Sequence, residues 1–406
     1  GIDFDKVPGV NDSYFHSTRL GHAIPTKIDH RSNAEFLSFG KMSAKYITAA
    51  PRRVFPLINP HALYYKGDLF VAGRIVQSKA VVWRIKRSAE YPLTGNLWRD
   101  LLLLKGIDWT KWTPQLRIRG SDPRLFVGPK GELGVVVCRR YTRREQIRQK
   151  VSEIYMGFDW LGTADGGLSS QTVHDMSSDV EAPMEDQKNW TPFNYDGKQL
   201  FIGDHGNPTH RIWQMGMVPF HSYVIHTQHM YQSAQVNFFR SSTIAQTRCT
   251  GENGQAAPQL WRWGSMRGGT SAQRLNRTHF LTFFHASTKP SGLGEGNVLK
   301  TYSMGAYIFS AEPPFEITAI SLIPIAHDSM YSGQWIYYPG APFLMDYVVF
   351  PTGFVLPLPG EDDVFLFYGH QDKQGWVLKM SLSGLLNGLE RVDRHACALE
   401  VLKSVL

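Results

Sequence analysis

The sequence predicts an all-β chain folded as a five-bladed β-propeller, with an N-terminal arm and long loops over a central funnel. Five segments share one order of features, recur roughly 65 to 80 residues apart, and contain apolar runs separated by Gly-containing or polar turns. Repetition of this kind is typical of arrays, and short apolar runs joined by tight turns make each unit a small antiparallel sheet. Such sheets arranged around a channel form a propeller. The alternative is an ordinary β-sandwich whose turns coincide by chance.

Each repeat opens with a polar residue that precedes a short strand, a turn and a second apolar strand. The openings are Asn59, Asp122, Lys188, Arg267 and Asp346. Because the blades of a propeller surround one channel, equivalent strand ends converge on its axis. We therefore expect these side chains around one funnel, which makes it the predicted site.

Asp122 is the opening residue with the most suggestive context, because Pro123 and Arg124 follow it. A proline fixes its own φ and disfavours the helical region for the residue before it, so Asp122 is expected in an extended conformation at a strand entrance. We interpret Asp122 as a catalytic acid/base. The alternative is an Asp-Pro turn with a structural role.

The ends of the chain predict elements that complete the propeller. Residues 1–50 have mixed polarity and are expected to form an arm that packs on the propeller or joins its last blade. Residues 51–406 are expected to form the catalytic propeller itself. Within the latter, residues 380–389 and 395–406 allow short closing helices.

Two stretches rich in Gly and polar residues, 161–187 and 249–272, predict long loops. The second stretch carries Trp261 and Trp263, which are candidate platforms for stacking a sugar ring. Aromatic residues make up 13% of the chain, and an aromatic-rich β core explains this content equally well.

The overall composition describes a globular protein with a basic balance. Apolar residues make up 42% of the chain and charged residues 19%, and the formal net charge is +8. A positive balance favours acidic partners such as phosphates, nucleotide sugars or an anionic surface. No nucleic-acid recognition motif is present, so we expect no nucleic-acid partner.

The cysteines and the hydropathy pattern give expectations about metal sites, disulfides, cofactors and membrane spans. Cys138, Cys249 and Cys397 form an odd set without a CxxC pair, so no metal site, disulfide framework or cofactor is predicted. No apolar stretch is long enough to span a bilayer. The sequence begins at Gly1, and the compartment stays open between the cytoplasm and, if a signal or anchor was removed, the secretory lumen.

The polar residues of the predicted funnel indicate sugar and phosphate chemistry. Most glycosidases need two carboxyl groups, whereas a phosphorylase or transferase can work with one, because its second substrate brings the nucleophile or the leaving group. That anionic substrate must be neutralised by basic side chains. The repeats supply both kinds of residue, namely Asp122, Asp346 and Asp372 with Arg74, Lys188, Arg267 and His285. Structural salt bridges between blades would give the same composition.

Five short islands between residues 55 and 380 resemble, in order, motifs of the β-mannoside phosphorylases of glycoside hydrolase family 130 and the related β-1,2-mannosyltransferase/phosphorylases of glycosyltransferase family 108. The islands are Asn59-Pro60 with Arg74, Ser121-Asp122-Pro123-Arg124, Lys188-Asn189, Gly268-Gly269-Thr270 through Phe284-His285, and Val349-Phe350-Pro351 with Tyr368-Gly369-His370-Gln371-Asp372. Both families are five-bladed propellers, so the resemblance implies the fold that the repeats predict.

The resemblance also implies site roles. Asp122 corresponds to the proton donor of the Glu-Asp-Pro-Arg motif in these families. The implied sugar-binding residues are Asn59, Arg74, Arg124 and Asp372. The predicted phosphate-binding residues are Lys188, His285, Lys79 and Arg267.

Departures from the family pattern favour a divergent, transferase-like member. Ser121 replaces the usual acidic residue, Ala286 stands at a usual Gly, and Asp346-Tyr347 stands where Pro-Asn is common. Lys79 is the basic residue nearest to the position of an early phosphate-binding Arg.

The resemblance implies an inverting enzyme that transfers or phosphorolyses β-linked mannosyl residues. Its donor would be mannose 1-phosphate or GDP-mannose, its acceptor an oligosaccharide and its product a β-1,2-mannoside, with inorganic phosphate as a further substrate. Two alternatives stay open. One is a propeller hydrolase with Asp122 and Asp346 as acid and base, for which a carboxyl separation of roughly 6.5–9.5 Å would suit inversion. The other is a carbohydrate-binding propeller without catalysis.

Overall fold

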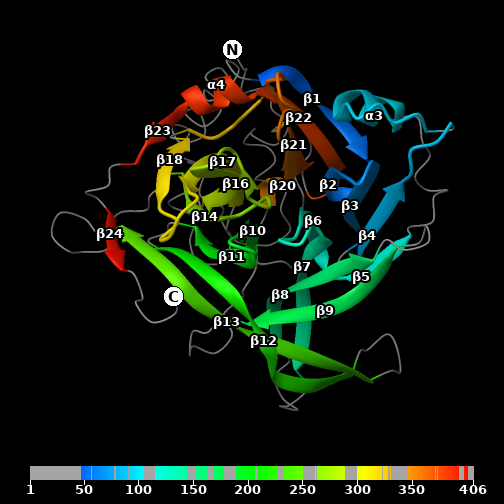
Figure 1. Ribbon diagram of the computed structural model, residues 1–406, viewed down its shortest axis with the longest axis vertical. Helices are drawn as coiled ribbons and strands as arrows, with labels where there is room; N and C mark the ends of the chain where they lie inside the picture. The colour runs from blue at the N-terminus through cyan, green and yellow to red at the C-terminus, as the bar shows by residue number, and fades with distance from the viewer. Residues whose placement is uncertain are drawn as a thin grey trace, which may run out of the picture.

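The structure is a computed structural model whose described residues form a ring of β-sheets (Figure 1). The description covers residues 47–55, 57–76, 79–89, 91–104, 115–143, 151–162, 168–177, 189–205, 209–226, 233–249, 261, 263–288, 300–321, 323–327, 330, 345–370, 372, 374–392 and 397–400.

Blades built mainly of antiparallel strands follow one another around this ring. The first two contain β2 (Ile58–Tyr65), β3 (Asp68–Val76), β4 (Lys79–Ile85) and β5 (Leu116–Arg119), then β6 (Ser121–Val127), β7 (Leu133–Arg143), β8 (Val151–Gly162) and β9 (Ser169–Ser177). The third contains β10 (Thr191–Tyr195), β11 (Lys198–His205), β12 (Thr209–His226) and β13 (Ser233–Cys249). The fourth contains β14 (Ser265–Gly268), β15 (Gln273–Arg274), β16 (His279–Thr288), β17 (Lys300–Ser310) and β18 (Ile317–Ser321), joined by β19 (Met345–Tyr347) and β23 (Leu389–Arg391). The last contains β20 (Val349–Val355), β21 (Asp363–His370) and β22 (Gln374–Ser381). The predicted all-β, five-bladed propeller is confirmed.

A strand from the start of the described chain completes the last blade. β1 (Ile47–Phe55) pairs antiparallel with β22, which gives this sheet the order β1-β22-β21-β20. The predicted division at residue 50 therefore falls inside β1. The rest of the predicted arm, residues 1–46, lies outside the described residues.

The second and third blades are joined in one nine-stranded sheet, because β13 pairs parallel with β9. β12 and β13 form a long hairpin that projects from the ring (Figure 1). β9 lies inside the predicted loop 161–187, so that prediction is wrong for this part of it. Its polar sequence forms a strand because backbone hydrogen bonds to β8 need no apolar side chains.

The C-terminal prediction also requires a correction. α4 (Leu382–Asn387) lies within the predicted helical segment 380–389. Within 395–406, however, residues 397–400 form strand β24 (Cys397–Glu400), which pairs antiparallel with β13. These residues form a strand because the backbone N–H and C=O groups at the edge of β13 can hydrogen-bond to a strand but not to a short helix.

The core is divided among the interfaces between neighbouring blades. Alternate side chains of a strand point to opposite faces, so one strand supplies two interfaces. In β7, Val135 and Val137 pack towards the first blade, whereas Val136 packs towards the third. In β3, Leu69 packs towards the last blade and Phe70 towards the second. This alternation, repeated around the ring, packs each blade between two others.

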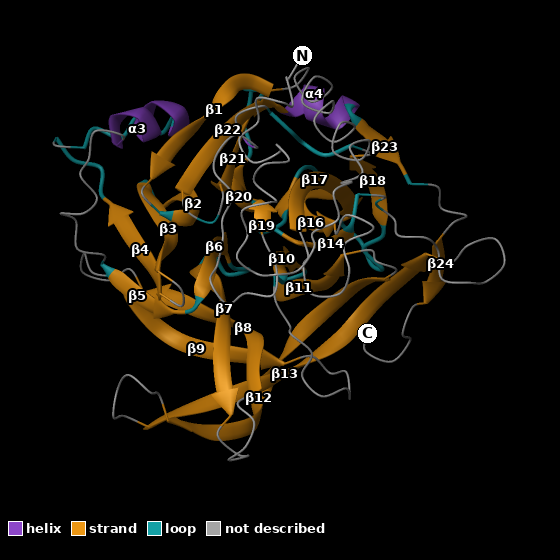
Figure 2. Cartoon of the chain, turned by 180° about the vertical axis from the view of Figure 1, so that it is seen from behind, coloured by secondary structure: helices purple, strands orange, loops and turns teal. Residues whose placement is uncertain are grey.

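The described helices lie at the rim rather than in the centre, as Figure 1 and Figure 2 show. α3 (Leu97–Leu104) buries Leu97 and Leu101 over the interface between the first and last blades. Ser381 directly precedes α4, and its side chain caps the helix by accepting a hydrogen bond from the Gly384 N–H. Among the described residues, neither helix is long and apolar enough to cross a membrane.

Two buried histidines make stability depend on pH. Burial lowers the pKa of His61 and of His210 to about 3 from an ordinary 6.5. Between these values the unfolded chain binds more protons than the folded chain. The free energy of unfolding is therefore retained above pH 6.5 and falls as the pH drops towards 3, by up to about 1.4 kcal/mol per pH unit for each histidine.

We expect His210→Gln to make this acid dependence shallower, because one of the two groups is removed while the side chain can still hydrogen-bond Tyr307. Urea unfolding at pH 7.5, 6.5, 5.5 and 5.0 measures the slope. An unchanged slope in the variant would contradict the assignment, whatever its absolute stability.

Candidate functional site

Three blades open on a polar residue with an unusual backbone conformation. Asn59, Asp122 and Asn189 have φ values of 53°, 52° and 67°. Asn and Asp tolerate this left-handed region better than most residues, and such strain occurs often at functional sites. Strand pairing is irregular on either side of Asn59 and Asp122, which re-aims their side chains. The expected extended conformation of Asp122 is wrong, although its place at the start of β6 matches the sequence analysis.

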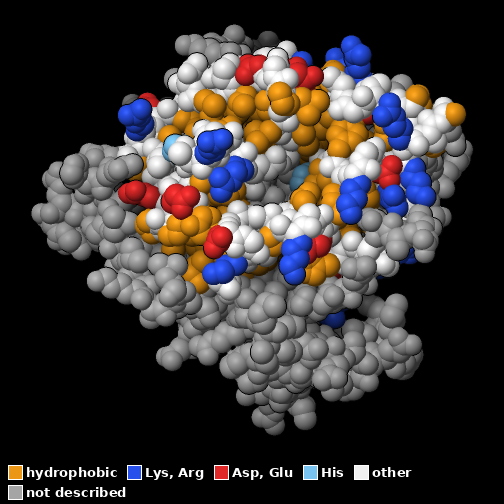
Figure 3. All heavy atoms as spheres, viewed as in Figure 1, with side chains coloured by type: hydrophobic (Ala, Val, Ile, Leu, Met, Phe, Trp, Pro, Cys, Tyr) orange, Lys and Arg blue, Asp and Glu red, His pale blue; other side chains and the backbone are white. Residues whose placement is uncertain are grey.

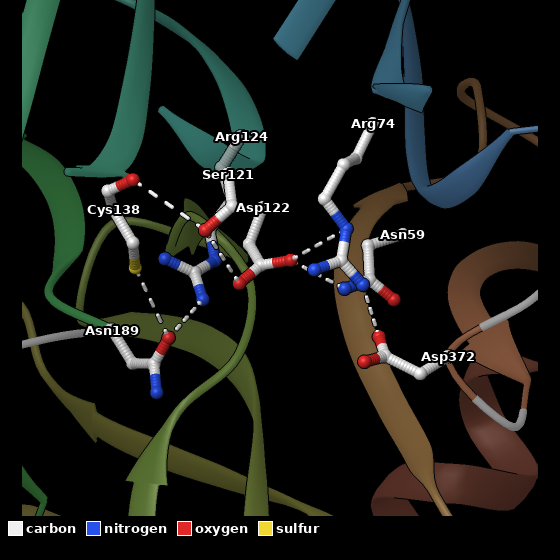
Figure 4. Close-up of polar contacts among 8 residues, drawn as sticks. All are labelled: Asn59, Arg74, Ser121, Asp122, Arg124, Cys138, Asn189 and Asp372. Carbon is white, nitrogen blue, oxygen red and sulfur yellow. Dashed lines mark hydrogen bonds and ion pairs between the residues drawn. The ribbon is translucent and has the colours of Figure 1, made fainter. Parts of the chain in front are cut away.

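Asp122 lies in a polar cluster formed by the first, second and last blades. Its Oδ1 accepts a hydrogen bond from Asn59 Nδ2 and lies 3.8 Å from Arg74 Nε. Arg74 Nη2 also donates to Asp372 Oδ1, so one guanidinium bridges two carboxylates (Figure 4). The Arg74 side chain is 9% exposed, whereas those of Asp122 and Asp372 are 20% and 22% exposed. The cluster is therefore buried at the Arg74 guanidinium and partly open to solvent at its two carboxylates.

A glycine of the last blade lets Asn59 fit into this cluster. A Cβ at Gly369 would lie 1.6 Å from Asn59 Oδ1, so a side chain there would displace Asn59. Asn59 is thus held between the backbone of β21 and Asp122. The cluster requires this close approach of two blades that lie far apart in the sequence.

A second guanidinium lies on the other side of Asp122. Arg124 is fully buried, and its Nη2 donates to Asn189 Oδ1 at 2.9 Å. Burial lowers the pKa of Arg124, while nearby Cys138 and Asp122 oppose this shift. Figure 4 shows the Arg124 guanidinium between Asn189 and Asp122. The resemblance implies sugar contact for Arg124, but the structure places it beneath the surface.

An aromatic ring connects Arg124 with the fourth blade. The Phe350 ring centroid lies 5.5 Å from the Arg124 guanidinium carbon and 4.5 Å from the His285 ring. His285 is buried, and its Nδ1 lies 3.0 Å from Gly268 O, so this nitrogen carries the proton. The predicted His285 thus joins the same region from its buried side.

Tyr302 lies beside His285, and no motif in the sequence had indicated it. Its ring stacks on His285 at 5.9 Å. Burial chiefly raises the pKa of Tyr302; Asp372 and Asp122 raise it further, whereas Arg267 lowers it. Arg267 and both carboxylates thus act on Tyr302 electrostatically. Arg267 lies opposite His285 in the β14–β16 pairing and is exposed.

Several predicted residues are not joined to the cluster by the described contacts. Lys79 is exposed at the start of β4, the third strand of its blade. Lys188 lies outside the described residues, directly before Asn189. Asp346 lies in β19, and its side chain is outside the description.

The predicted tryptophan platforms require a correction. Trp261 is 1% exposed, and its Nε1 donates to Ser321 O at 2.6 Å. Trp263 is half-buried and packs against the core. Trp261 is therefore a core residue, and its aromatic surroundings rather than a ligand explain its presence.

The described surface carries charges of both signs (Figure 3). Over the described part of the face in Figure 3, Lys and Arg side chains are scattered among Asp and Glu rather than gathered in one patch. Within the described ranges, His, Cys, Asp and Glu do not form a group of three or more that could hold a metal ion. The described polar groups of the cluster are the carboxylates of Asp122 and Asp372, the guanidinium groups of Arg74 and Arg124, and the amides of Asn59 and Asn189.

Comparison with known proteins gives similarity at the level of solved structures. Neither a family model nor a curated protein matches the chain. A mannose phosphorylase, MPT-4, from Leishmania mexicana is 15% identical, with a TM-score of 0.46, over 89% of this chain and 98% of that one. MPT-1, a GDP-Man-dependent mannosyltransferase from the same organism, is 12% identical, with a TM-score of 0.41, over 82% and 90%. A β-1,2-mannobiose phosphorylase from Listeria innocua is 14% identical, with a TM-score of 0.41, over 83% and 92%.

The similar structures include the kinds of protein that the sequence motifs resemble. At these identities and scores, the similarity gives no information on substrate or chemistry. Those must come from the side chains of the site.

Proposed function

We propose that the chain is an inverting carbohydrate-active enzyme that transfers or phosphorolyses β-linked mannosyl residues, with Asp122 as its general acid/base. The observation that carries the proposal is the cluster in which Asn59 and Arg74 orient a partly exposed Asp122, while Asp372 is paired with the same Arg74. A fixed carboxylate at the surface is the group that proton transfer to a glycosidic oxygen requires.

The roles of the two carboxylates differ because their partners differ. Asp372 is bound to Arg74 and offers its remaining lone pairs to sugar hydroxyls, together with Asn59 at the edge of the cluster. Asp122 lies farther from the guanidinium, at 3.8 Å, and is available for proton transfer. One acid/base group is sufficient when a phosphate-bearing substrate supplies the nucleophile or the leaving group.

The reaction needs a single displacement. In breakdown, a phosphate oxygen attacks C1 of the mannosyl unit while Asp122 gives a proton to the departing oxygen, directly or through a sugar hydroxyl. In synthesis, an acceptor hydroxyl attacks C1, Asp122 takes its proton, and phosphate or a nucleoside diphosphate leaves. One displacement inverts the anomeric centre, so an α-linked donor gives a β-mannoside.

Basic residues of the third and fourth repeats are assigned to the anionic group. Arg267 is exposed and lies close enough to influence Tyr302, which both carboxylates also influence. Lys188, next to Asn189, and His285, behind Phe350, are assigned to the same group. Guanidinium and ammonium groups stabilise phosphate through charge-assisted hydrogen bonds.

A donor screen tests the proposal. Mannose 1-phosphate and GDP-mannose are each incubated with a panel of mannoside acceptors, and release of phosphate or GDP is measured together with the oligosaccharide product. In the reverse direction, β-1,2-mannobiose is incubated with and without phosphate. Product formation from one donor supports the proposal. Phosphate-independent release of mannose would favour the hydrolase, and binding without turnover would favour the non-catalytic propeller.

We expect Lys188→Ala to raise the KM for the phosphate-bearing substrate by about 10- to 100-fold, since a hydrogen bond to a charged group contributes roughly 1.5–3 kcal/mol. Affinity for a simple mannoside should stay unchanged. The matched control is Lys198→Ala, which removes an exposed lysine at the start of β11 in the third blade. Equal loss of mannoside binding in Lys188→Ala would count against the phosphate assignment.

A further inference from the structure

Both oxygens of the Asp122 carboxylate have polar partners, and these partners come from different sides. Oδ1 accepts a hydrogen bond from Asn59 Nδ2 and lies 3.8 Å from Arg74 Nε. Oδ2 accepts a hydrogen bond from the hydroxyl of Ser121 at 3.3 Å. Figure 4 shows Ser121 beside the carboxylate, on the side away from Arg74. The proposed function uses the contacts of Oδ1 and gives no role to Ser121.

The contact between Ser121 and Asp122 depends on an irregular backbone. The two residues are adjacent in β6, and adjacent side chains of a regular strand point to opposite faces. Asp122, however, has a φ of 52°, and the pairing of β6 with β7 is irregular between Ser121 and Arg124. An irregularity of this kind re-aims a side chain. It brings the carboxylate to the hydroxyl of the residue directly before it.

Strand β7 holds Ser121 in place. Ser121 lies opposite Cys138 in the β6–β7 pairing, and its Oγ lies 3.5 Å from Cys138 O. Gly120 permits this close approach, since a Cβ there would lie 2.7 Å from Val137 Cβ and 3.0 Å from Cys138 O. A hydroxyl has one proton to donate, and a carboxylate is a stronger acceptor than a carbonyl. Ser121 therefore donates to Asp122 from a position fixed by the neighbouring strand.

We propose that Ser121 is a positioning residue that holds Asp122 Oδ2 as the oxygen through which the proton is transferred. The inference rests on the proposed role of Asp122 as general acid/base. Oδ1 faces nitrogen atoms of Asn59 and Arg74, whose hydrogens need an acceptor, so a proton on Oδ1 would meet other donors. Oδ2 uses one lone pair for Ser121 and keeps the other for the proton and the sugar oxygen.

The proton moves between two oxygens, and Ser121 keeps its own proton throughout. In breakdown, the bond between Oδ2 and the proton breaks, its electron pair stays on Oδ2, and the proton bonds to the departing sugar oxygen. In synthesis, the proton moves from the acceptor hydroxyl to Oδ2. A hydrogen bond to an ionised acceptor is stronger than one to a neutral acceptor. Ser121 therefore stabilises the transition state of breakdown, in which charge develops on Oδ2, more than the ground state.

Ser121→Ala and Ser121→Thr test the inference, because Thr alone keeps the hydroxyl and suits a strand. Each is assayed with phosphate on the β-mannoside product found by the donor screen and on 4-nitrophenyl β-mannoside, whose phenolate leaves without a proton. We expect Ser121→Ala to lower kcat/KM for the sugar leaving group by about 10-fold, the lower end for a hydrogen bond to a charged group. Its kcat/KM for the aryl mannoside should stay near that of the wild type, and Ser121→Thr should retain both activities.

Crystal structures of the wild type and the two variants give a readout that is independent of turnover. The Asp122 carboxylate should rotate in Ser121→Ala and keep its wild-type orientation in Ser121→Thr. Ser310→Ala is the matched control, because Ser310 ends β17, is also partly buried, and accepts a hydrogen bond from the Glu312 N–H at 3.1 Å. Its kinetics on both substrates should equal those of the wild type.

The outcomes separate positioning from a structural role. An unrotated carboxylate in Ser121→Ala would overturn the inference, whatever the rate. Equal loss of both substrates in Ser121→Ala, or no rescue by Ser121→Thr, would also overturn it, because a merely structural role does not depend on the leaving group. A rotated carboxylate without mannosyl turnover by the wild type would instead refute the proposed function and leave the hold of Ser121 on Asp122 intact.

Discussion

Asp122→Asn is expected to lower turnover by about 10²- to 10⁴-fold, because Asn keeps the size of the side chain but cannot transfer a proton, and general acid/base catalysis contributes this much. The fold should survive. Asn tolerates the φ of 52°, and its carbonyl oxygen can still accept the hydrogen bond from Asn59. Arg74 keeps its bond to Asp372. Steady-state kinetics on the donor found by the screen gives kcat and KM, and calorimetry gives the affinity for the mannoside.

The matched control for this variant is Asp196→Asn. Asp196 also has a left-handed conformation, with φ of 47°, but it is exposed in the turn between β10 and β11. The control should retain full turnover. Near-normal turnover of Asp122→Asn would remove Asp122 from the mechanism and direct attention to Asp346 and the hydrolase. Loss of folding instead of rate would show that Asp122 serves a structural turn.

Arg74→Met is expected to lower turnover by about 100-fold, the effect that small misplacement of a catalytic group can have. Met preserves the buried aliphatic stem but leaves Asp122 and Asp372 without their shared cation. Breaking a buried pair in this way costs about 3–5 kcal/mol, and we expect the lower end because both carboxylates remain about one-fifth exposed. Urea unfolding measures the stability, and kinetics above the transition baseline measures the rate.

Arg84→Met provides the matched control, because Arg84 pairs with Asp68 at 2.6 Å in the same blade and is similarly shielded from solvent. It should lose stability without losing turnover. A double-mutant cycle of Arg74→Met with Asp372→Asn isolates the bridge, and we expect a coupling of roughly 0.5–3 kcal/mol. Full activity of Arg74→Met, or a coupling near zero, would contradict the role of Arg74 as the bridge between the two carboxylates.

Local patterns in the sequence were sufficient to predict the blades. The polar openings at Asn59 and Asp122 begin or enter the first strands of two blades, as their recurrence predicted. The alternation around Val135 and Val136 packs one strand against two neighbours. Both signals act within a few residues, because strand periodicity and turn chemistry are local properties of the chain. They therefore identify units and their order, and with them the region where equivalent ends meet.

Only the tertiary structure decided which side chains meet. Arg74 and Asp372 are separated by 298 positions in the chain, and they pair because β1 joins β22 and brings the last blade beside the first. The burial of Arg124 and its bond to Asn189 likewise depend on the contact between the second and third blades. Trp261 entered the core at the contact between the third and fourth blades, where its ring also packs on Phe284. Such pairs carry no local pattern, because their energy is realised only when blades distant in sequence pack together and exclude water.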